Sequence, residues 1–219
     1  MATESLDSKR GRARKIIATL KKTHPDARLA LDYSNPLELL VALILAAQAR
    51  DDLVNTVTPA LFRKYRTAAA YAEEKEEVLR QQVARINFYR NKTRSIQGAC
   101  RAVVANFGGR VPDNMDDLLS LPGVGRKTAN AVLANAFGQP AIVVDTHVGR
   151  LSQRLGLTRG DDPEKIEADL VELVPKKDWT SLCHLMQFHG RRVCAARNPA
   201  CPNCSIRDLC PWTGKTKAK

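Results

Sequence analysis

Four cysteines near the end of the chain restrict its fold more than any other feature. They lie in the segment RRVCAARNPACPNCSIRDLCPW, as Cys194, Cys201, Cys204 and Cys210. A fold must bring them together around a metal or join them in two disulfides, unless their clustering is a coincidence. The remaining two cysteines of the 219-residue chain, Cys100 and Cys183, are predicted to be small buried side chains.

The rest of the sequence favours a reducing compartment. The start, MATESLDSKRGRARKI, has no apolar secretory region, and the longest apolar stretch, PLELLVALILAAQA, is too short to span a bilayer. We therefore expect no membrane association and a cytosolic or nuclear protein. Disulfides are disfavoured in such a compartment, where clustered cysteines indicate a metal or catalysis.

The charge balance favours a polyanionic partner. The chain has 35 Lys and Arg against 23 Asp and Glu, which gives a net charge of +12. This excess suits nucleic acid, but charge alone does not choose between DNA, RNA and a membrane surface. Two basic stretches at the ends, residues 8–15 and 213–219, are expected to be solvated tails.

Helical periodicity runs through nearly all of the chain and predicts an all-α fold. Asn35 and Pro36 are typical of a helix start, and that helix is expected to continue to about residue 49. Apolar residues repeat at three or four through residues 91–107 before two glycines, and DDPEKIEADLVELVP begins with a capping Asp and a first-turn Pro. The one strand-like run, AIVVDTHV, has no partner strand.

A glycine turn between two short helices indicates phosphate binding. In MDDLLSLPGVGRKTANAVLANAFG, residues 116–120 and 126–137 are predicted helices, and Gly123 and Gly125 lie in the turn. Without side chains at these positions, backbone N–H groups can approach an anion closely. Such a helix-hairpin-helix grips a DNA phosphate without reading sequence. The alternative is an ordinary hairpin between packed helices.

Two residues that follow this turn in the sequence have the chemistry of a covalent catalyst. Lys127 lies on a face of small residues, apart from the apolar stripe of its helix. In a cleft, desolvation would expose a nucleophilic amine there; a solvated lysine or a phosphate contact is the alternative. Asp145 follows an apolar run at the start of a helix, where it can cap that helix, stabilise a developing cation or serve as a base.

Taken together, LPGVGRKTAN, VDTHVGR and the spacing Cys-x6-Cys-x2-Cys-x5-Cys resemble the endonuclease III family of DNA glycosylases over most of the chain. In that family this cysteine spacing holds a 4Fe-4S cluster through four thiolates. Structural zinc also takes four cysteines, although zinc ribbons usually carry two Cys-x2-Cys pairs and this segment has one. The resemblance therefore implies a cluster ligated by Cys194, Cys201, Cys204 and Cys210.

The resemblance also implies the reaction. Lys127 matches the family's Schiff-base nucleophile and Asp145 its second catalytic residue. A damaged base is flipped out of duplex DNA, Lys127 attacks C1′ and expels the base, and β-elimination breaks the strand 3′ to the abasic site. Asp145 assists the amine and stabilises the cationic sugar.

The DNA contacts implied by the family are a longer set. Gln48 matches a glutamine that fills the gap left by the flipped nucleotide, and Phe88 lies where an apolar wedge enters the stack, with a place in the core as its alternative. Arg50 and Asn87 depart from the small polar residue and the glycine expected there, which affects opposite-strand contacts and substrate range. The DNA-binding residues implied are Gln48, Phe88, Gly123, Gly125, His147, Arg191 and Arg192.

The family fold has two helical lobes with the DNA cleft between them. It implies a helical-barrel domain with the hairpin at residues 29–139 and a discontinuous iron–sulfur domain of residues 1–28 plus 140–219. The implied protein is a monomeric, bifunctional glycosylase and AP lyase of base excision repair, acting on oxidised pyrimidines in double-stranded DNA. A monofunctional adenine-mismatch glycosylase, disfavoured by Lys127, and a non-catalytic DNA-binding redox module are the alternatives.

Overall fold

The computed structural model describes residues 4–217, and these divide into two compact units. Unit 2 is Leu29–Gln139, and unit 1 is the described part of Met1–Arg28 and Pro140–Lys219. Residues 1–3 and 218–219, the outermost ends of the predicted iron–sulfur domain and of the second basic tail, lie outside the described residues. Each unit has its own cluster of buried apolar side chains.

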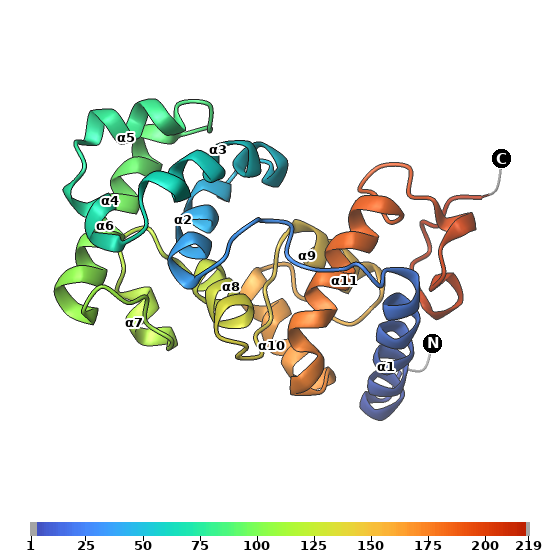
Figure 1. Cartoon of the computed structure of the whole chain (residues 1–219). Coiled ribbons are helices and arrows are strands. Elements are labelled where there is room, and N and C mark those ends of the chain that lie inside the picture. Colours follow the sequence, from blue (N-terminus) through green and yellow to red (C-terminus); the bar gives the residue numbers. More distant parts are fainter. Residues whose placement is uncertain (1–3, 218–219) are drawn as a thin grey trace. The chain divides into compact units, whose positions relative to one another are not determined.

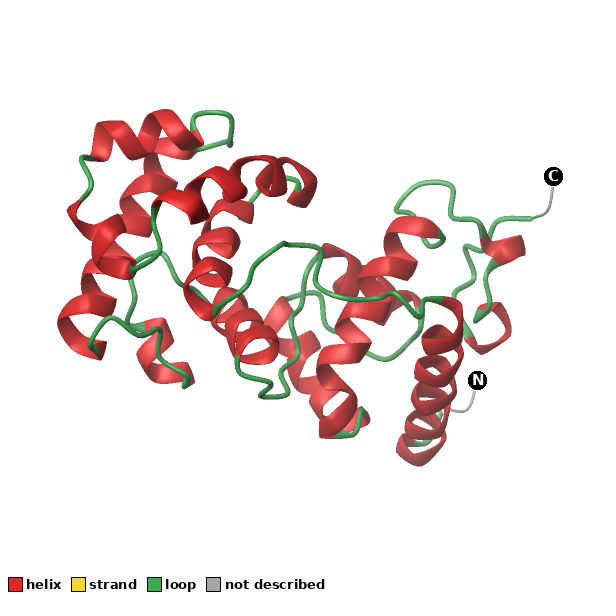
Figure 2. Cartoon of the chain, in the orientation of Figure 1, coloured by secondary structure: helices red, strands yellow, loops and turns green. Residues whose placement is uncertain are grey.

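Both units are built from helices, and residues 4–217 contain no strand, so the all-α prediction is confirmed (Figure 2). Unit 2 holds α2 (Pro36–Ala46), α3 (Asp51–Lys64), α4 (Ala68–Glu73), α5 (Glu76–Val83), α6 (Tyr89–Phe107), α7 (Met115–Leu119) and α8 (Arg126–Ala136). Unit 1 holds α1 (Leu6–Thr23), α9 (Thr146–Arg154), α10 (Pro163–Leu173) and α11 (Trp179–Arg192), with 3₁₀ turns at Lys176–Asp178, Cys201–Asn203 and Arg207–Leu209 (Figure 1).

The predicted caps set most of these boundaries. Asn35 and Asp162 accept hydrogen bonds from the backbone N–H three residues on, and Gly108 ends α6 in the left-handed conformation at φ +58°. The helix from Pro36 ends at Ala46 rather than near residue 49, because Gln48 also adopts a left-handed conformation, at φ +54°. No helix among residues 4–217 is both long and apolar enough to cross a membrane.

The prediction of a solvated basic tail is wrong for residues 8–15. Helix α1 begins at Leu6 and buries Ala13 and Ile16 in the core of unit 1. Arg12 donates hydrogen bonds to the carbonyl oxygens of Leu155 and Leu209, at 2.6 and 3.2 Å. A charge run can therefore belong to a packed helix, because long basic side chains lie along the surface while their head groups bind carbonyl oxygens.

Candidate active site and metal centre

The predicted glycine turn joins α7 to α8 within unit 2. Gly123 has φ +78°, and a Cβ atom there would lie 2.5 Å from Cβ of Ser95, so this position requires glycine on two counts. Gly125 is the N-cap of α8 and is exposed, without a side-chain capping bond. The first N–H groups of a helix lack partners within the helix, so the start of α8 can receive an anion.

Lys127 is the second residue of α8 and is exposed. The side chains of Asn130, Ala131 and Ala134 are buried. The exposure agrees with the solvated alternative for this lysine rather than with an amine buried among small residues. Its amine is open to a ligand from outside the chain.

Asp145 is the N-cap of α9 and is half-buried. Its Oδ1 accepts hydrogen bonds from the backbone N–H groups of His147 and Val148, at 2.9 and 2.7 Å. The predicted capping role is therefore confirmed. Both capping bonds go to Oδ1, so capping does not use Oδ2.

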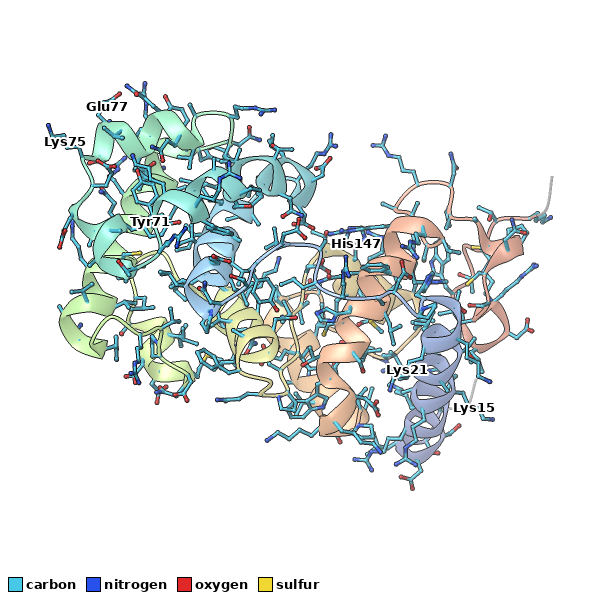
Figure 3. The ribbon with its side chains drawn as sticks, viewed as in Figure 1. Lys15, Lys21, Tyr71, Lys75, Glu77 and His147 are labelled. Atoms are coloured by element: carbon cyan, nitrogen blue, oxygen red, sulfur yellow. The ribbon has the colours of Figure 1, made fainter. Side chains whose placement is uncertain are left out.

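His147 is the second residue of α9, and its side chain lies against Gly190 of α11 in unit 1 (Figure 3). Its Nδ1 is 3.1 Å from Nη2 of Arg150, and a Cβ atom on Gly190 would lie 2.8 Å from the same nitrogen. Burial is the main cause that lowers the pKa of His147, so the neutral ring is favoured. This environment gives His147 a packing role in the free chain.

Gln48 and Phe88 share an unusual backbone conformation and both are exposed. Gln48 has φ +54° and Phe88 has φ +58°, a region that non-glycine residues seldom adopt. Phe88 is 61% exposed, so the alternative place in the core is wrong. Strained residues of this kind concentrate at ligand sites. Sequence patterns gave no indication of either conformation.

The two residues that depart from the family pattern adjoin these positions. Arg50, the N-cap of α3, pairs with Asp52 through two guanidinium nitrogens, with Nε 3.0 Å from Oδ1. Both side chains of this pair are exposed, as is Asn87. Arg50 therefore places a positive charge two residues from Gln48, with a carboxylate already beside it.

The two arginines at the end of α11 differ in their surroundings. Arg192 makes two hydrogen bonds to Asp26, at 3.0 and 2.6 Å, and its guanidinium stacks 4.6 Å from the ring centre of Phe188. This pair joins the chain after α1 to the end of α11. Arg191 is exposed.

We call residues 194–217 the cysteine segment. Its four cysteines line one cavity in unit 1, together with residues of α9 and α11. All four are free thiols, which leaves no disulfide in the segment. Nη1 of Arg154 donates to Sγ of Cys194 at 3.2 Å, and Nε2 of His189 lies 3.3 Å from Sγ of Cys204. Burial lowers the pKa of His189 to about 4. The hydrogen bond from Arg154 would stabilise the thiolate form of Cys194.

Four cysteines around one cavity can ligate a single ion or a larger group. Four thiolates around zinc, at Zn–S distances of about 2.3 Å, would lie about 3.8 Å apart. Within residues 4–217, no three His, Cys, Asp or Glu side chains converge closely enough to hold one metal ion. Yet all four cysteines face a common cavity. Four thiols lining one cavity fit the set of four thiolates that an iron–sulfur cluster takes.

The other two cysteines are buried, as predicted. Cys183 accepts a hydrogen bond from the N–H of Val143 at 3.2 Å, and burial raises the pKa of both Cys100 and Cys183 to about 12. Both thiols therefore stay protonated. The sequence analysis missed Arg150 and Arg154, which bind the cysteine segment through its carbonyl oxygens.

Comparison with known proteins places this chain in a class. Residues 41–176 match the pattern of the HhH-GPD superfamily of base excision DNA repair proteins. A solved structure described as a trapped endonuclease III–DNA covalent intermediate superposes with a TM-score of 0.88 at 45% identity, covering 96% of this chain and 97% of that one. A thermostable thymine-DNA glycosylase at 24% identity shares the fold, with a TM-score of 0.81.

The sequence relatives are more specific. Endonuclease III of Synechocystis sp. is 52% identical over 93% of this chain and 94% of the relative. Endonuclease III of Escherichia coli K12 is 39% identical over 91% of this chain and 95% of the relative. The chain belongs to the endonuclease III family.

Proposed function

We propose that Lys127 is the nucleophile, and Asp145 its catalytic partner, of a bifunctional DNA glycosylase and AP lyase that excises oxidised pyrimidines. Membership of the endonuclease III family makes the chain a base excision repair enzyme of this type. The observation that carries the residue assignment is the exposed amine of Lys127, two residues after the uncapped glycine turn. A helix start that binds phosphate would hold the sugar of DNA near that amine.

The chemistry follows from a primary amine. The lone pair of the Lys127 amine attacks C1′ of the damaged nucleotide, and the base leaves with the electrons of the glycosidic bond. Loss of a proton from nitrogen and opening of the sugar give an imine between Lys127 and C1′. The imine acidifies the hydrogens at C2′, so removal of one expels the 3′ phosphate and breaks the strand. Water in place of the amine would only release the base.

Asp145 is suited to handle the proton and the positive charge. Its carboxylate accepts the proton that the Lys127 amine loses, and it stabilises the cationic sugar as the base departs. The capping hydrogen bonds to Oδ1 fix the orientation of the carboxylate and leave Oδ2 for this work. Because one oxygen caps the helix and the other stays available, a residue at a helix start can also act in catalysis.

Binding uses duplex DNA that contains a damaged base or an abasic site. Solved structures of relatives with DNA support DNA as the partner. The backbone N–H groups near Gly123 and Gly125 receive a phosphate, Gln48 fills the gap left by the flipped nucleotide, and Phe88 enters the base stack. Arg191 and Arg192 add positive charge, Arg192 while paired with Asp26. His147, the second residue of α9, adds a further DNA contact. A monomer suffices for these contacts.

The cysteine segment would hold a 4Fe-4S cluster through Cys194, Cys201, Cys204 and Cys210, and this makes unit 1 the iron–sulfur domain and unit 2 the helical barrel. When bound, the cluster would tie the four cysteines of this segment together, and no step of base removal passes through it. Arg154 and His189 would donate hydrogen bonds to its thiolates.

Borohydride trapping tests the proposal. Wild type, Lys127→Gln and the control Lys75→Gln, another exposed lysine of unit 2 (Figure 3), are reacted with a duplex holding one thymine glycol and with a duplex holding one abasic site. We expect covalent adducts on both duplexes for wild type and the control, and none for Lys127→Gln. Trapping by Lys127→Gln would contradict the nucleophile, and trapping on the abasic duplex alone would contradict the substrate. A monofunctional enzyme would release base without any adduct.

A further inference from the structure

The end of α2 depends on a lysine from another helix. The last carbonyl groups of a helix lack partners within it. The N–H of Ala49 turns to the carbonyl oxygen of Ala46, at 3.0 Å, and so does not reach that of Leu45. Instead, Nζ of Lys92 in α6 donates to the Leu45 carbonyl oxygen at 2.8 Å. The carbonyl satisfied in this way lies three residues before Gln48.

The same lysine is bound to the turn that carries Phe88. Its backbone N–H donates to the carbonyl oxygen of Phe88 at 3.1 Å, the first hydrogen bond of α6. Lys92 thus binds the turn of Gln48 through its side chain and the turn of Phe88 through its backbone. Helices α2 and α6 pack against each other within unit 2 (Figure 1). Both turns contain an exposed residue in the left-handed conformation.

The burial of the Lys92 amine costs free energy, which a functional role for this lysine would explain. Its side chain is 6% exposed, and burial lowers the pKa of its amine, with no carboxylate of the described residues paired with it. Taking an ammonium group out of water is unfavourable, and an apolar side chain of similar length would fill the same space. What only a long donor can supply is the bond that fixes the end of α2.

We propose that Lys92 is a positioning residue for DNA distortion, which holds the turns of Gln48 and Phe88 at the spacing needed for both side chains to enter the duplex together. This rests on the proposed insertion of Gln48 and Phe88. Lys92 touches no DNA in this role and takes no part in the chemistry of Lys127.

The variant Lys92→Met removes the hydrogen bond and keeps the length of the side chain. Its matched control is Gln97→Met, also in α6 and buried, which removes donations to the carbonyl oxygens of Glu74 and Tyr71, at 2.7 and 3.3 Å, that lead to neither turn. Lys92→Gln, shorter but still a donor, serves if the methionine variant does not fold. Thermal unfolding reports folding for all three variants.

Two readouts separate positioning from stability. The first is the fluorescence of 2-aminopurine placed opposite thymine glycol, which rises when the base is unstacked by the bound enzyme. The second is borohydride trapping on single-stranded abasic DNA, where no duplex has to be distorted. We expect Lys92→Met to lower both the fluorescence rise and the single-turnover excision rate on the duplex, the rate by on the order of tenfold or more. Trapping on the single strand should be unchanged, and Gln97→Met should behave as wild type in both.

The double variant Gln48→Ala/Phe88→Ala, called the background variant, distinguishes failure of the Lys92 role from failure of the proposed insertion. If Lys92 acts through these two residues, adding Lys92→Met to that background lowers excision no further. A normal fluorescence rise in Lys92→Met, with a reduced rise in the background variant, would overturn the role of Lys92 and leave the insertion intact. A normal rise in the background variant would overturn the insertion itself, and the positioning role with it.

Discussion

Unit 2 and the cysteine segment are held in place by different forces. Unit 2 packs seven helices around buried apolar side chains contributed by every one of them. In residues 194–217 the buried apolar side chains are Pro199, Ile206 and the thiol-bearing Cys201, and the only helical turns have three residues each. The buried apolar area can stabilise unit 2, but it is too small to stabilise the cysteine segment.

Arginines supply part of what the cysteine segment lacks. Arg154 donates to the carbonyl oxygens of Ala195 and Ala196, at 2.8 and 2.9 Å, and its guanidinium stacks on Trp212. Arg150 donates to the carbonyl oxygen of Cys194 at 3.0 Å. Arg150 and Arg154, two of the chain's basic residues, are thus already bound to groups within unit 1. The difference between the regions teaches that a segment with few apolar groups needs polar links to its neighbours and, on our proposal, a metal cluster.

Removal of one proposed ligand should have the largest effect. Cys201→Ser should lose the visible absorption of the cluster and the hydrogen-exchange protection of residues 194–217, because metal binding contributes roughly 10 kcal/mol or more to small metal-dependent folds. Amides of unit 2 should keep their protection. Hydrogen exchange read by mass spectrometry measures both. Equal loss in the two regions would contradict the comparison, and Cys183→Ser is the control at a buried cysteine outside the site.

A cavity in the core of unit 2 should give the converse result. Leu79 of α5 is fully buried, and Leu79→Ala should destabilise unit 2 by about 2–5 kcal/mol through lost apolar contact and the space left behind. The absorption of the cluster should be unaffected. Urea unfolding can be followed by the absorption of the cluster and by the helical signal of unit 2. Loss of both in the same transition would argue against separate sources of stability.

How far the sequence could predict the structure depends on the kind of signal. Caps such as Asn35 and Asp162 act within one turn, so their helices were predicted near their true starts. The spacing of the cysteines and the glycine turn placed the candidate site. The left-handed conformations of Gln48 and Phe88 could not be predicted, because neither residue type favours positive φ and the surrounding packing imposes it.

Polar contacts between residues far apart in the sequence also could not be predicted. Arg12 was assigned to a solvated tail, yet it binds carbonyl oxygens more than 140 residues away in the sequence. Nothing local in the sequence marks Lys92 as buried or the carbonyl oxygen of Leu45 as its partner. Periodicity predicts which face is buried, but it does not predict which buried polar group meets which.

A smaller effect is expected from an unsatisfied hydroxyl in unit 2. Tyr71 is fully buried (Figure 3), and its Oη has no hydrogen-bond partner among the described residues. Burial raises the pKa of this hydroxyl. Tyr71→Phe removes a polar atom that lost its water on folding, so we expect unit 2 to gain about 1 kcal/mol of stability in urea unfolding. A loss of stability would indicate a partner for the hydroxyl.

The smallest effect concerns pH. Hydrogen bonds from Lys64 and Tyr65, both 2.8 Å to Oε2, hold the pKa of Glu74 at about 2. Because the folded-state pKa is depressed, the contribution of Glu74 to stability is complete above about pH 4.5 and is lost as the pH falls towards 2. Glu74→Gln should therefore lower the Tm of unit 2 slightly at pH 7, and this difference should shrink as the pH falls to 2 and vanish below it. A pH-independent difference would contradict this origin. Glu77→Gln is the exposed control (Figure 3).

The most direct test of the central claim is to locate the trapped adduct in the chain. Wild-type enzyme reduced with borohydride on a thymine glycol duplex is digested with protease and nuclease, and the peptide carrying the sugar remnant is sequenced by mass spectrometry. We predict a single modified residue, Lys127. Modification of any other lysine, or of the N-terminal amine, would contradict the assignment of the nucleophile and with it the mechanism proposed for this chain.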